Sequence, residues 1–278
     1  MVAPASANVI GKIAYGIADD MLTTTVMACP CKKMISPAMN HNMYHNPIVQ
    51  DNIQKLERFG YEMIAPDRGM LANGDDGDGR MPEPEVLFEY ILRELAFEKD
   101  LAGKKVLVTA GATMEAIDPV RYITNHSSGK MGCAVAKAAM QRGAKVTLVA
   151  GHMEVLPPMF VDVVNVKSAA DMFEAVTKLA PEQDIIVKAA AVADYTPVAV
   201  ADNKIKKSDD DMKIELKRTK DILGYLGQHK RDGQVICGFS METQDVIKNS
   251  EKKLTNKNCD MISVSYTHLR AHETGAYL

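Results

Sequence analysis

The chain has 278 residues, of which 46% are hydrophobic and 25% are charged, a composition typical of a globular protein with a substantial core. A formal net charge of -3 provides no general attraction to nucleic acids or anionic membranes, which disfavours both as partners. Five scattered cysteines argue against a disulfide framework, and no run approaches the roughly 20 apolar residues of a membrane span. We therefore expect a cytoplasmic protein, and its length favours two domains of ordinary size.

The first part of the chain predicts helices separated by short apolar segments. Helices are expected where apolar residues recur at helical spacing: 7–22, 47–59 and 84–97. A short strand is expected over 61–65, and residues 66–83, with four glycines and four aspartates, predict a long loop. Cys29 and Cys31 flank a proline, but without two further ligands nearby we interpret them as free thiols rather than as a zinc site.

The polar stretch 98–103 is the predicted boundary between two domains, because the pattern beyond it changes to alternating strands and helices. The expected elements in this second part are strands over 105–109, 145–150 and 184–188, helices over 131–142 and 169–179, strands at 214–216 and 235–237, and a helix over 246–254. Such alternation predicts a parallel sheet with helices on both faces, whose strands end at one ligand-binding edge.

A loop rich in glycine and hydroxyl groups follows the first of these strands. Gly111 is not followed by the closely spaced glycines of a dinucleotide fingerprint, and Met131 replaces the Ser or Thr that a P-loop needs after Gly129-Lys130. What remains is a helix N-terminus whose amides suit an anion such as a phosphate. A plain helix cap made by Ser127 or Ser128 accounts for the same spacing equally well.

Three motifs in this second part resemble those of phosphopantothenate-cysteine ligase. They are GATMEAIDPVRYITNHSSGKMG at 111–132, AAAVADY at 189–195 and KIKK at 204–207, and the resemblance covers nearly all of residues 104–262. It implies a Rossmann-like ligase domain in which CTP, accompanied by Mg²⁺, activates 4'-phosphopantothenate as an acyl cytidylate before cysteine attacks. One departure is Ala112, where the family commonly has glycine.

The resemblance also implies roles for single residues. Lys204 would neutralise charge on phosphate, and Asn125 would position the acyl intermediate. Independently of the resemblance, the guanidinium of Arg121 could grip a carboxylate or phosphate in bidentate fashion. The residues expected to contact CTP are Lys188, Ala189, Ala190, Asp194, Lys204, Asp221, Ile222, Leu223, Phe239, Lys253 and Lys257. Each has a plainer alternative: lysines in solvated loops, a turn asparagine and a core phenylalanine are common. Thr219-Lys220 departs from the family's usual Asn-Pro.

The N-terminal part resembles the phosphopantothenoylcysteine decarboxylase family, an FMN-dependent flavodoxin-like fold. The motifs that carry this resemblance are PASAN at 4–8, GIADD at 16–20, PAMNHNMYHNP at 37–47 and GRMPEPE at 79–85. It implies a partial flavodoxin-like domain over 1–97. The residues expected to bind substrate near the flavin are Asn8, Pro37, Ala38, Met39 and Asn40. Asn73 stands in the expected substrate flap 69–81 where the family has a cysteine, and an amide cannot donate a proton as a thiol does.

Bacteria commonly fuse these two enzymes in one chain with the decarboxylase first, the order found here, and relatives are homo-oligomers. We expect both ends to be cut: no strand precedes the motif at 4–8, and residues 263–278 match nothing in the family and resemble foreign sequence. The chain alone is then not expected to decarboxylate. Two other hypotheses stay open, an inactive assembly module derived from a flavoprotein and a generic Rossmann oxidoreductase.

Overall fold

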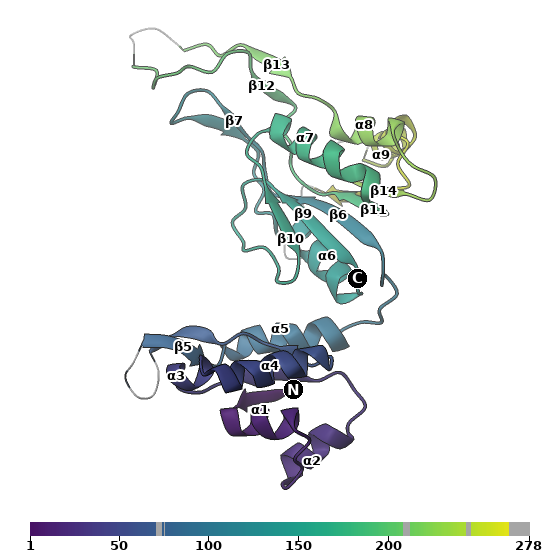
Figure 1. Ribbon diagram of the computed structural model, residues 1–278. Helices are drawn as coiled ribbons and strands as arrows, with labels where there is room; N and C mark the ends of the chain where they lie inside the picture. The colour runs from purple at the N-terminus through teal and green to yellow at the C-terminus, as the bar shows by residue number, and fades with distance from the viewer. Residues whose placement is uncertain (71–73, 75, 208–211, 243–245, 267–278) are drawn as a thin grey trace. The chain divides into compact units, whose positions relative to one another are not determined.

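A computed structural model describes residues 1–266 apart from 71–73, 75, 208–211 and 243–245 (Figure 1). The chain divides into two compact units, Met1–Tyr90 and Ile91–Leu278. Both combine helices with parallel strands, as predicted. In the described part of the chain, no helix is both long and apolar enough to cross a bilayer.

The first unit is built on a small parallel sheet in the order β1 (Val2–Ala5), β2 (Met34–Pro37), β3 (Glu62–Met63). Its helices are α1 (Ala7–Ala14), α2 (Met21–Ala28), α3 (His41–Tyr44), α4 (Pro47–Arg58) and α5 (Pro84–Leu95), the last of which runs past the division between the units. Ile10, Ile35 and Leu56 are buried together in its core, so the apolar faces of α1 and α4 pack against β2.

The single helix predicted over 7–22 is wrong. Helix α1 ends at Ala14, and Gly16 adopts a left-handed φ of 70°, a conformation that glycine reaches without a Cβ penalty. A separate helix, α2, then begins because the Asp20 carboxylate accepts a hydrogen bond from the Thr23 amide at 2.8 Å. The side chain of Ile17, which appeared to extend the apolar pattern, is exposed.

The long loop predicted over 66–83 contains a hairpin instead. Strands β4 (Asp67–Met70) and β5 (Asp76–Arg80) pair antiparallel, with Gly69 opposite Gly77. A Gly- and Asp-rich sequence carries no strand pattern, so only the backbone pairing reveals these strands. The hairpin is anchored where the Met39 amide donates to the Gly79 carbonyl at 3.0 Å.

The second unit contains a six-stranded parallel sheet in the order β10-β9-β6-β11-β14-β15. The bounds of its strands are β6 (Lys105–Ala110), β9 (Lys145–Ala150), β10 (Asp162–Asn165), β11 (Ile185–Lys188), β14 (Val235–Glu242) and β15 (Met261–Tyr266). Counted along the chain this is 3-2-1-4-5-6, the order of the doubly wound dinucleotide-binding fold. The predicted parallel sheet is therefore confirmed.

Helices cover both faces of this sheet. The second unit has two clusters of buried apolar residues. Helix α6 (Lys130–Gln141) packs on β6 and β9 in the first cluster, and α7 (Ala169–Leu179) and α8 (Ile222–Gln228) contribute to the second. Helix α9 (Val246–Asn256) contacts β14 and β15, and a short 3-10 helix, Ala180–Glu182, leads into β11.

The sequence did not predict several short elements of the second unit. They are β10, α8, β15, the hairpin β7 (Met114–Ala116) with β8 (Tyr122–Thr124), and β12 (Tyr195–Pro197), which pairs with β13 (Leu216–Arg218). The strand expected at 214–216 begins only at Leu216. Strand β15 continues to Tyr266, beyond the boundary expected at residue 262, while residues 267–278 lie outside the described part.

Gly132 provides a direct test of how tightly α6 packs on β6. A Cβ at this position would lie 2.5 Å from the Cβ of Ala110 and 2.9 Å from the carbonyl oxygen of Thr109. Gly132→Ala is therefore expected to lower the free energy of unfolding by roughly 1–3 kcal/mol, measured by urea denaturation. Gly11→Ala, inside α1 with its nearest neighbour 3.7 Å away, is the control and is expected to be neutral or stabilising by up to about 1 kcal/mol. Equal effects would contradict the close packing.

Candidate functional site

The strand order reverses between β6 and β11: the chain continues from β6 to β9 on one side and from β11 to β14 on the other. The loops that leave these strands are hydrogen-bonded to each other: the Ala191 amide donates to the Gly111 carbonyl at 2.8 Å, and the Thr113 amide donates to the Ala191 carbonyl at 3.2 Å. In open α/β sheets, ligands bind at this switch point, so we place the candidate site here.

Two buried threonines that sequence reasoning missed brace the switch point. The hydroxyl of Thr109 accepts a hydrogen bond from the Ala190 amide at 3.1 Å, and that of Thr113 accepts one from the Ala193 amide at 2.9 Å. Their position at and just after a strand end was visible in the sequence, but their partners about 80 residues away were not. They fix the backbone at Ala190 and Ala193, and Ala190 belongs to the segment expected to line the nucleotide.

Helix α6 presents its N-terminus without a side-chain cap. Its N-cap residue is Gly129, with a left-handed φ of 78°, and no side chain of the described residues accepts from the first amides. A Cβ on Gly129 would lie 2.7 Å from the Cγ of Met153, so the turn requires glycine. The alternative of a cap by Ser127 or Ser128 is therefore wrong, and the amides stay available to an anion.

Lys188 ends β11 at the same edge of the sheet. Its burial, together with repulsion from Lys253, lowers the pKa of its ammonium group to about 8, against the attraction of Asp221 and Asp194. Lys253, on α9, donates to the Phe239 carbonyl at 3.3 Å. The structure thus gathers two ammonium groups at this edge, an arrangement that an incoming anion would stabilise.

Asp221 joins this group from the start of α8. Its carboxylate accepts from the Gly224 amide at 2.9 Å and forms an ion pair with Lys257. Burial raises the pKa of Asp221, but these hydrogen bonds and the nearby positive charges outweigh burial and lower it. The two residues that follow, Ile222 and Leu223, are buried in the core, so the Asp221 segment offers one exposed carboxylate rather than three contacting side chains.

The remaining residues expected near CTP differ in how exposed they are. The Asp194 side chain is exposed, and Asn125 lies at the switch point because its amide donates to the Ala191 carbonyl at 3.4 Å. Phe239 packs against the core cluster of α6 and is only partly buried.

A second group of contacts joins Arg121 to the segment that carries Lys204. The buried Asp118 carboxylate accepts two hydrogen bonds from the Arg121 guanidinium, at 2.9 and 2.5 Å, and one from the Ile205 amide at 3.2 Å. The guanidinium also donates to the Ile205 carbonyl at 2.7 Å. Burial raises the pKa of Asp118, but the hydrogen bonds outweigh burial and hold it well below its usual range.

These contacts anchor the backbone on both sides of Ile205, between Lys204 and Lys206. The three lysines of this segment, Lys204, Lys206 and Lys207, are exposed and line an open cavity of about 1370 Å³ together with Arg121. The acidic residues 209–211 that follow lie outside the described part of the chain.

In the first unit, the expected substrate residues lie at the ends of β1 and β2. The Ala38 amide donates to the Ala5 carbonyl at 2.9 Å, and Asn40 caps α3 by accepting from the Asn42 amide at 2.9 Å. Asn8 is exposed on the first turn of α1, and Pro37 is buried. Asn73 lies outside the described residues, so the structure does not place it.

The chain matches two family models, Flavoprotein over residues 1–96 and the DNA/pantothenate metabolism flavoprotein C-terminal domain over residues 101–274. These models agree with the flavodoxin-like and Rossmann-like folds expected of the two parts. A solved structure of the C-terminal domain of a coenzyme A biosynthesis bifunctional protein CoaBC is 47% identical with a TM-score of 0.53, covering 59% of this chain and 78% of that one.

Two curated relatives match nearly the whole chain. It is 51% identical over 265 residues to the coenzyme A biosynthesis bifunctional protein CoaBC of Bacillus subtilis (strain 168), covering 94% of this chain and 65% of the relative. It is 45% identical over 267 residues to a cysteine/cysteine sulfinic acid decarboxylase of an unknown prokaryotic organism, covering 94% of this chain and 74% of that protein. The chain thus spans about two thirds to three quarters of the length of these relatives.

Proposed function

Since this chain belongs to the DNA/pantothenate metabolism flavoprotein family, which includes the bifunctional coenzyme A biosynthesis proteins, we propose that its second unit uses CTP to join 4'-phosphopantothenate to cysteine. The observation that carries the proposal is the anion site at the sheet switch point. There the uncapped N-terminus of α6 and the ammonium groups of Lys188 and Lys253 supply positive charge, which Asp194 and Asp221 offset only in part, since the pKa of Lys188 remains lowered. A triphosphate satisfies both groups.

In the proposed reaction, the carboxylate of 4'-phosphopantothenate attacks the α-phosphorus of CTP and releases pyrophosphate. The amine of cysteine then attacks the carbonyl carbon of the acyl cytidylate, forms the amide and releases CMP. Lys204 stabilises the negative charge that develops on phosphate, and Asn125 holds the intermediate by its amide. The exposed Asp194 carboxylate suits Mg²⁺ bound with the triphosphate, since Mg²⁺ commonly pairs one or two carboxylates with phosphate oxygens.

Calorimetric titration of CTP and ATP into the purified chain tests this proposal. CTP is expected to bind with release of heat and to bind more tightly than ATP. If neither nucleotide binds at millimolar concentration, the second unit is not a nucleotide-using ligase. Titration with NADH distinguishes the oxidoreductase hypothesis, which the absence of a compact glycine fingerprint after β6 disfavours.

We assign Arg121 a positioning role rather than direct contact with the reacting atoms, because its guanidinium is held by Asp118 and Ile205. Asp118→Asn removes the charge that holds this arrangement and is expected to lower kcat/KM of the ligase by roughly tenfold through misplacement of Lys204. Asp202→Asn, at an exposed position on the same segment, is the control and is expected to leave the rate unchanged.

Pyrophosphate release measures both variants, and CTP affinity is expected to change little in either. A loss of CTP binding in Asp118→Asn as large as the loss of rate would show that the variant disturbs the whole unit instead of one segment.

For the first unit, we propose an FMN-dependent decarboxylation of 4'-phosphopantothenoylcysteine, with Asn8 and the segment 37–40 on the substrate side. Bound FMN supplies two-electron redox chemistry to this reaction. The buried Ser36 hydroxyl at the end of β2 has no hydrogen-bond partner among the described residues, which fits a polar ligand at this strand end. Flavin absorbance of the purified chain tests the cofactor, and a colourless preparation that takes up no FMN would contradict the proposal.

The relative named as a cysteine/cysteine sulfinic acid decarboxylase makes substrate choice a further point to measure. Carbon dioxide release from 4'-phosphopantothenoylcysteine and from free cysteine separates the two substrates.

We also propose residues 98–103 as the linker, supported by the gap between the two matched models, residues 97–100. A homo-oligomeric state stays a prediction, which light scattering measures.

A further inference from the structure

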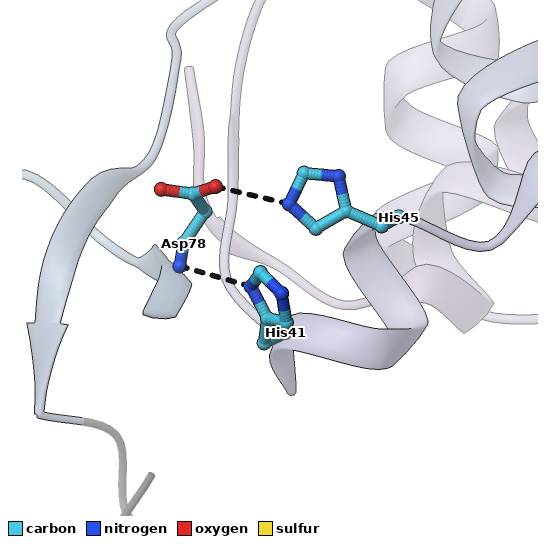
Figure 2. A group of neighbouring side chains, drawn as sticks. All are labelled: His41, His45 and Asp78. Carbon is cyan, nitrogen blue, oxygen red and sulfur yellow. Dashed lines mark hydrogen bonds and ion pairs between the residues drawn. The ribbon is translucent and has the colours of Figure 1, made fainter. Parts of the chain in front are cut away.

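A group of three polar side chains in the first unit has no role in the proposed reactions. His41 and His45 lie one helical turn apart, at the first residue and the C-cap of α3, with ring centroids 4.4 Å apart. Asp78 reaches them from β5: its carboxylate Oδ2 lies 2.9 Å from Nε2 of His45, and its amide donates to Nδ1 of His41 at 3.2 Å (Figure 2). One ligand atom from each residue lies within 4.8 Å of the others.

We propose that His41, His45 and Asp78 bind one divalent transition-metal ion, for which Zn²⁺ is the best match. Two imidazole nitrogens and one carboxylate oxygen form a set typical of zinc, with a fourth position left for water. Imidazole nitrogen disfavours the hard cations Mg²⁺ and Ca²⁺, which prefer oxygen ligands. The site is separate from the Mg²⁺ proposed to accompany CTP.

The geometry needs only side-chain adjustment. Zinc bonds of about 2.1 Å in a tetrahedron separate the ligand atoms by roughly 3.4 Å. The present separations run from 2.9 Å, between Nε2 of His45 and Oδ2 of Asp78, to at most 4.8 Å, so each pair has to move apart or together by no more than about 1.5 Å. The partly exposed side chains of His45 and Asp78 can turn to do so.

Both imidazoles already direct a ring nitrogen toward Asp78 (Figure 2). Nδ1 of His41 accepts a hydrogen bond, so it carries a lone pair, the form that a metal ion requires at that atom. At His45, the ion takes the place of the proton between Nε2 and Oδ2, and this proton moves to Nδ1 or to solvent. Binding therefore replaces one hydrogen bond between side chains and one hydrogen bond from a backbone amide with three metal–ligand bonds.

Two glycines of the hairpin make this approach of β5 to α3 sterically feasible. A Cβ on Gly77 would lie 2.8 Å from the imidazole ring of His41, and one on Gly79 would overlap the Met39 carbonyl oxygen. A bound ion would tie the β4–β5 hairpin to the start of α3, directly after the segment 37–40. This gives the site a structural consequence: the metal holds the hairpin against that segment.

The test uses the full chain without a polyhistidine tag, carrying Cys29→Ser and Cys31→Ser. These two thiols, 2.9 Å apart, are removed because they would bind zinc independently. Calorimetric titration with Zn²⁺ is expected to give one ion per chain, and Co²⁺ is expected to produce the visible absorption of a low-symmetry, four- or five-coordinate site. His45→Ala and Asp78→Asn are each expected to weaken Zn²⁺ affinity at least tenfold. His229→Gln is the control, because His229 contacts Tyr225 in the second unit, and it is expected to change nothing.

A matched pair of glycine variants tests the geometry without touching a ligand. Gly77→Ala is expected to displace the His41 ring and weaken Zn²⁺ binding, whereas Gly69→Ala, directly opposite on β4 with its nearest neighbour 3.8 Å away, is expected to retain it. Circular dichroism and CTP titration verify that each variant is folded. The proposal is overturned if Zn²⁺ does not bind at micromolar concentration, or if His45→Ala and Asp78→Asn bind it as tightly as the parent chain.

Discussion

Lys204→Ala is expected to lower the turnover of CTP-dependent ligation by roughly 100- to 1000-fold, the effect of removing one preorganised group that stabilises charge in a transition state. Its side chain is exposed beside the backbone anchor at Ile205, so it reaches the ligand from a fixed base. Since Lys204 acts on charge that develops during the reaction, kcat is expected to fall more than the affinity for CTP. Pyrophosphate release under saturating substrates measures the effect.

Lys217→Ala is the matched control for this prediction. Lys217 is also an exposed lysine on an extended segment, in β13, where it lies opposite Thr196 of β12. Its loss is expected to change the rate by less than threefold, in line with the small effect of most surface substitutions. Equal losses in the two variants would return Lys204 to the alternative of a solvated loop lysine. An unchanged kcat with a raised KM would assign it to ground-state binding instead.

Lys188→Met is expected to stabilise the folded second unit at pH 7 while it weakens CTP binding more than tenfold. The pKa of Lys188 falls from 10.5 to about 8 in the folded chain because the ammonium group is buried. The folded state therefore binds this proton more weakly than the unfolded state, and at pH 7 the charged side chain costs up to roughly 3 kcal/mol. Methionine fills the same space without a charge, so it removes the stability cost. It also removes the ammonium group that would bind the triphosphate.

The sign of this effect fixes its pH dependence. The cost is fully present below about pH 8, declines as pH rises toward 10.5, and vanishes above 10.5, where Lys188 is neutral in both states. The parent chain is thus expected to gain stability relative to Lys188→Met over this window, measured by urea denaturation at several pH values. CTP affinity of the parent chain is expected to fall as pH rises through 8, because the neutral amine no longer attracts phosphate.

Lys178→Met, on the exposed face of α7, provides the control, with an expected change in stability of less than about 0.5 kcal/mol and full CTP affinity. If Lys188→Met were destabilising at pH 7, the buried ammonium would have compensating partners beyond Asp194 and Asp221. If it kept CTP affinity, the triphosphate would not lie at the end of β11.

The sequence alone determined the regular part of the second unit. Strands β6 and β9 consist mainly of apolar residues, and α6 and α7 repeat apolar residues at helical spacing, so local pattern and final burial agree. The motifs also indicated the family. The short strands β7, β8 and β12 were not predicted, and β13 only at Leu216, because strands of three residues paired through their backbones are too short to show an alternating pattern.

Only the tertiary structure decided which side chains meet. The DPVR motif contains both Asp118 and Arg121, but nothing local shows that the pair would hold the backbone of Ile205, 84 residues beyond Arg121. Likewise, the two histidines of PAMNHNMYHNP stand one turn apart in the sequence, yet their third partner, Asp78, lies in a segment whose composition predicted a loop. Composition and spacing determine local conformation. These two groups of side chains depend instead on contacts between distant segments, and the sequence of neither segment specifies those contacts by itself.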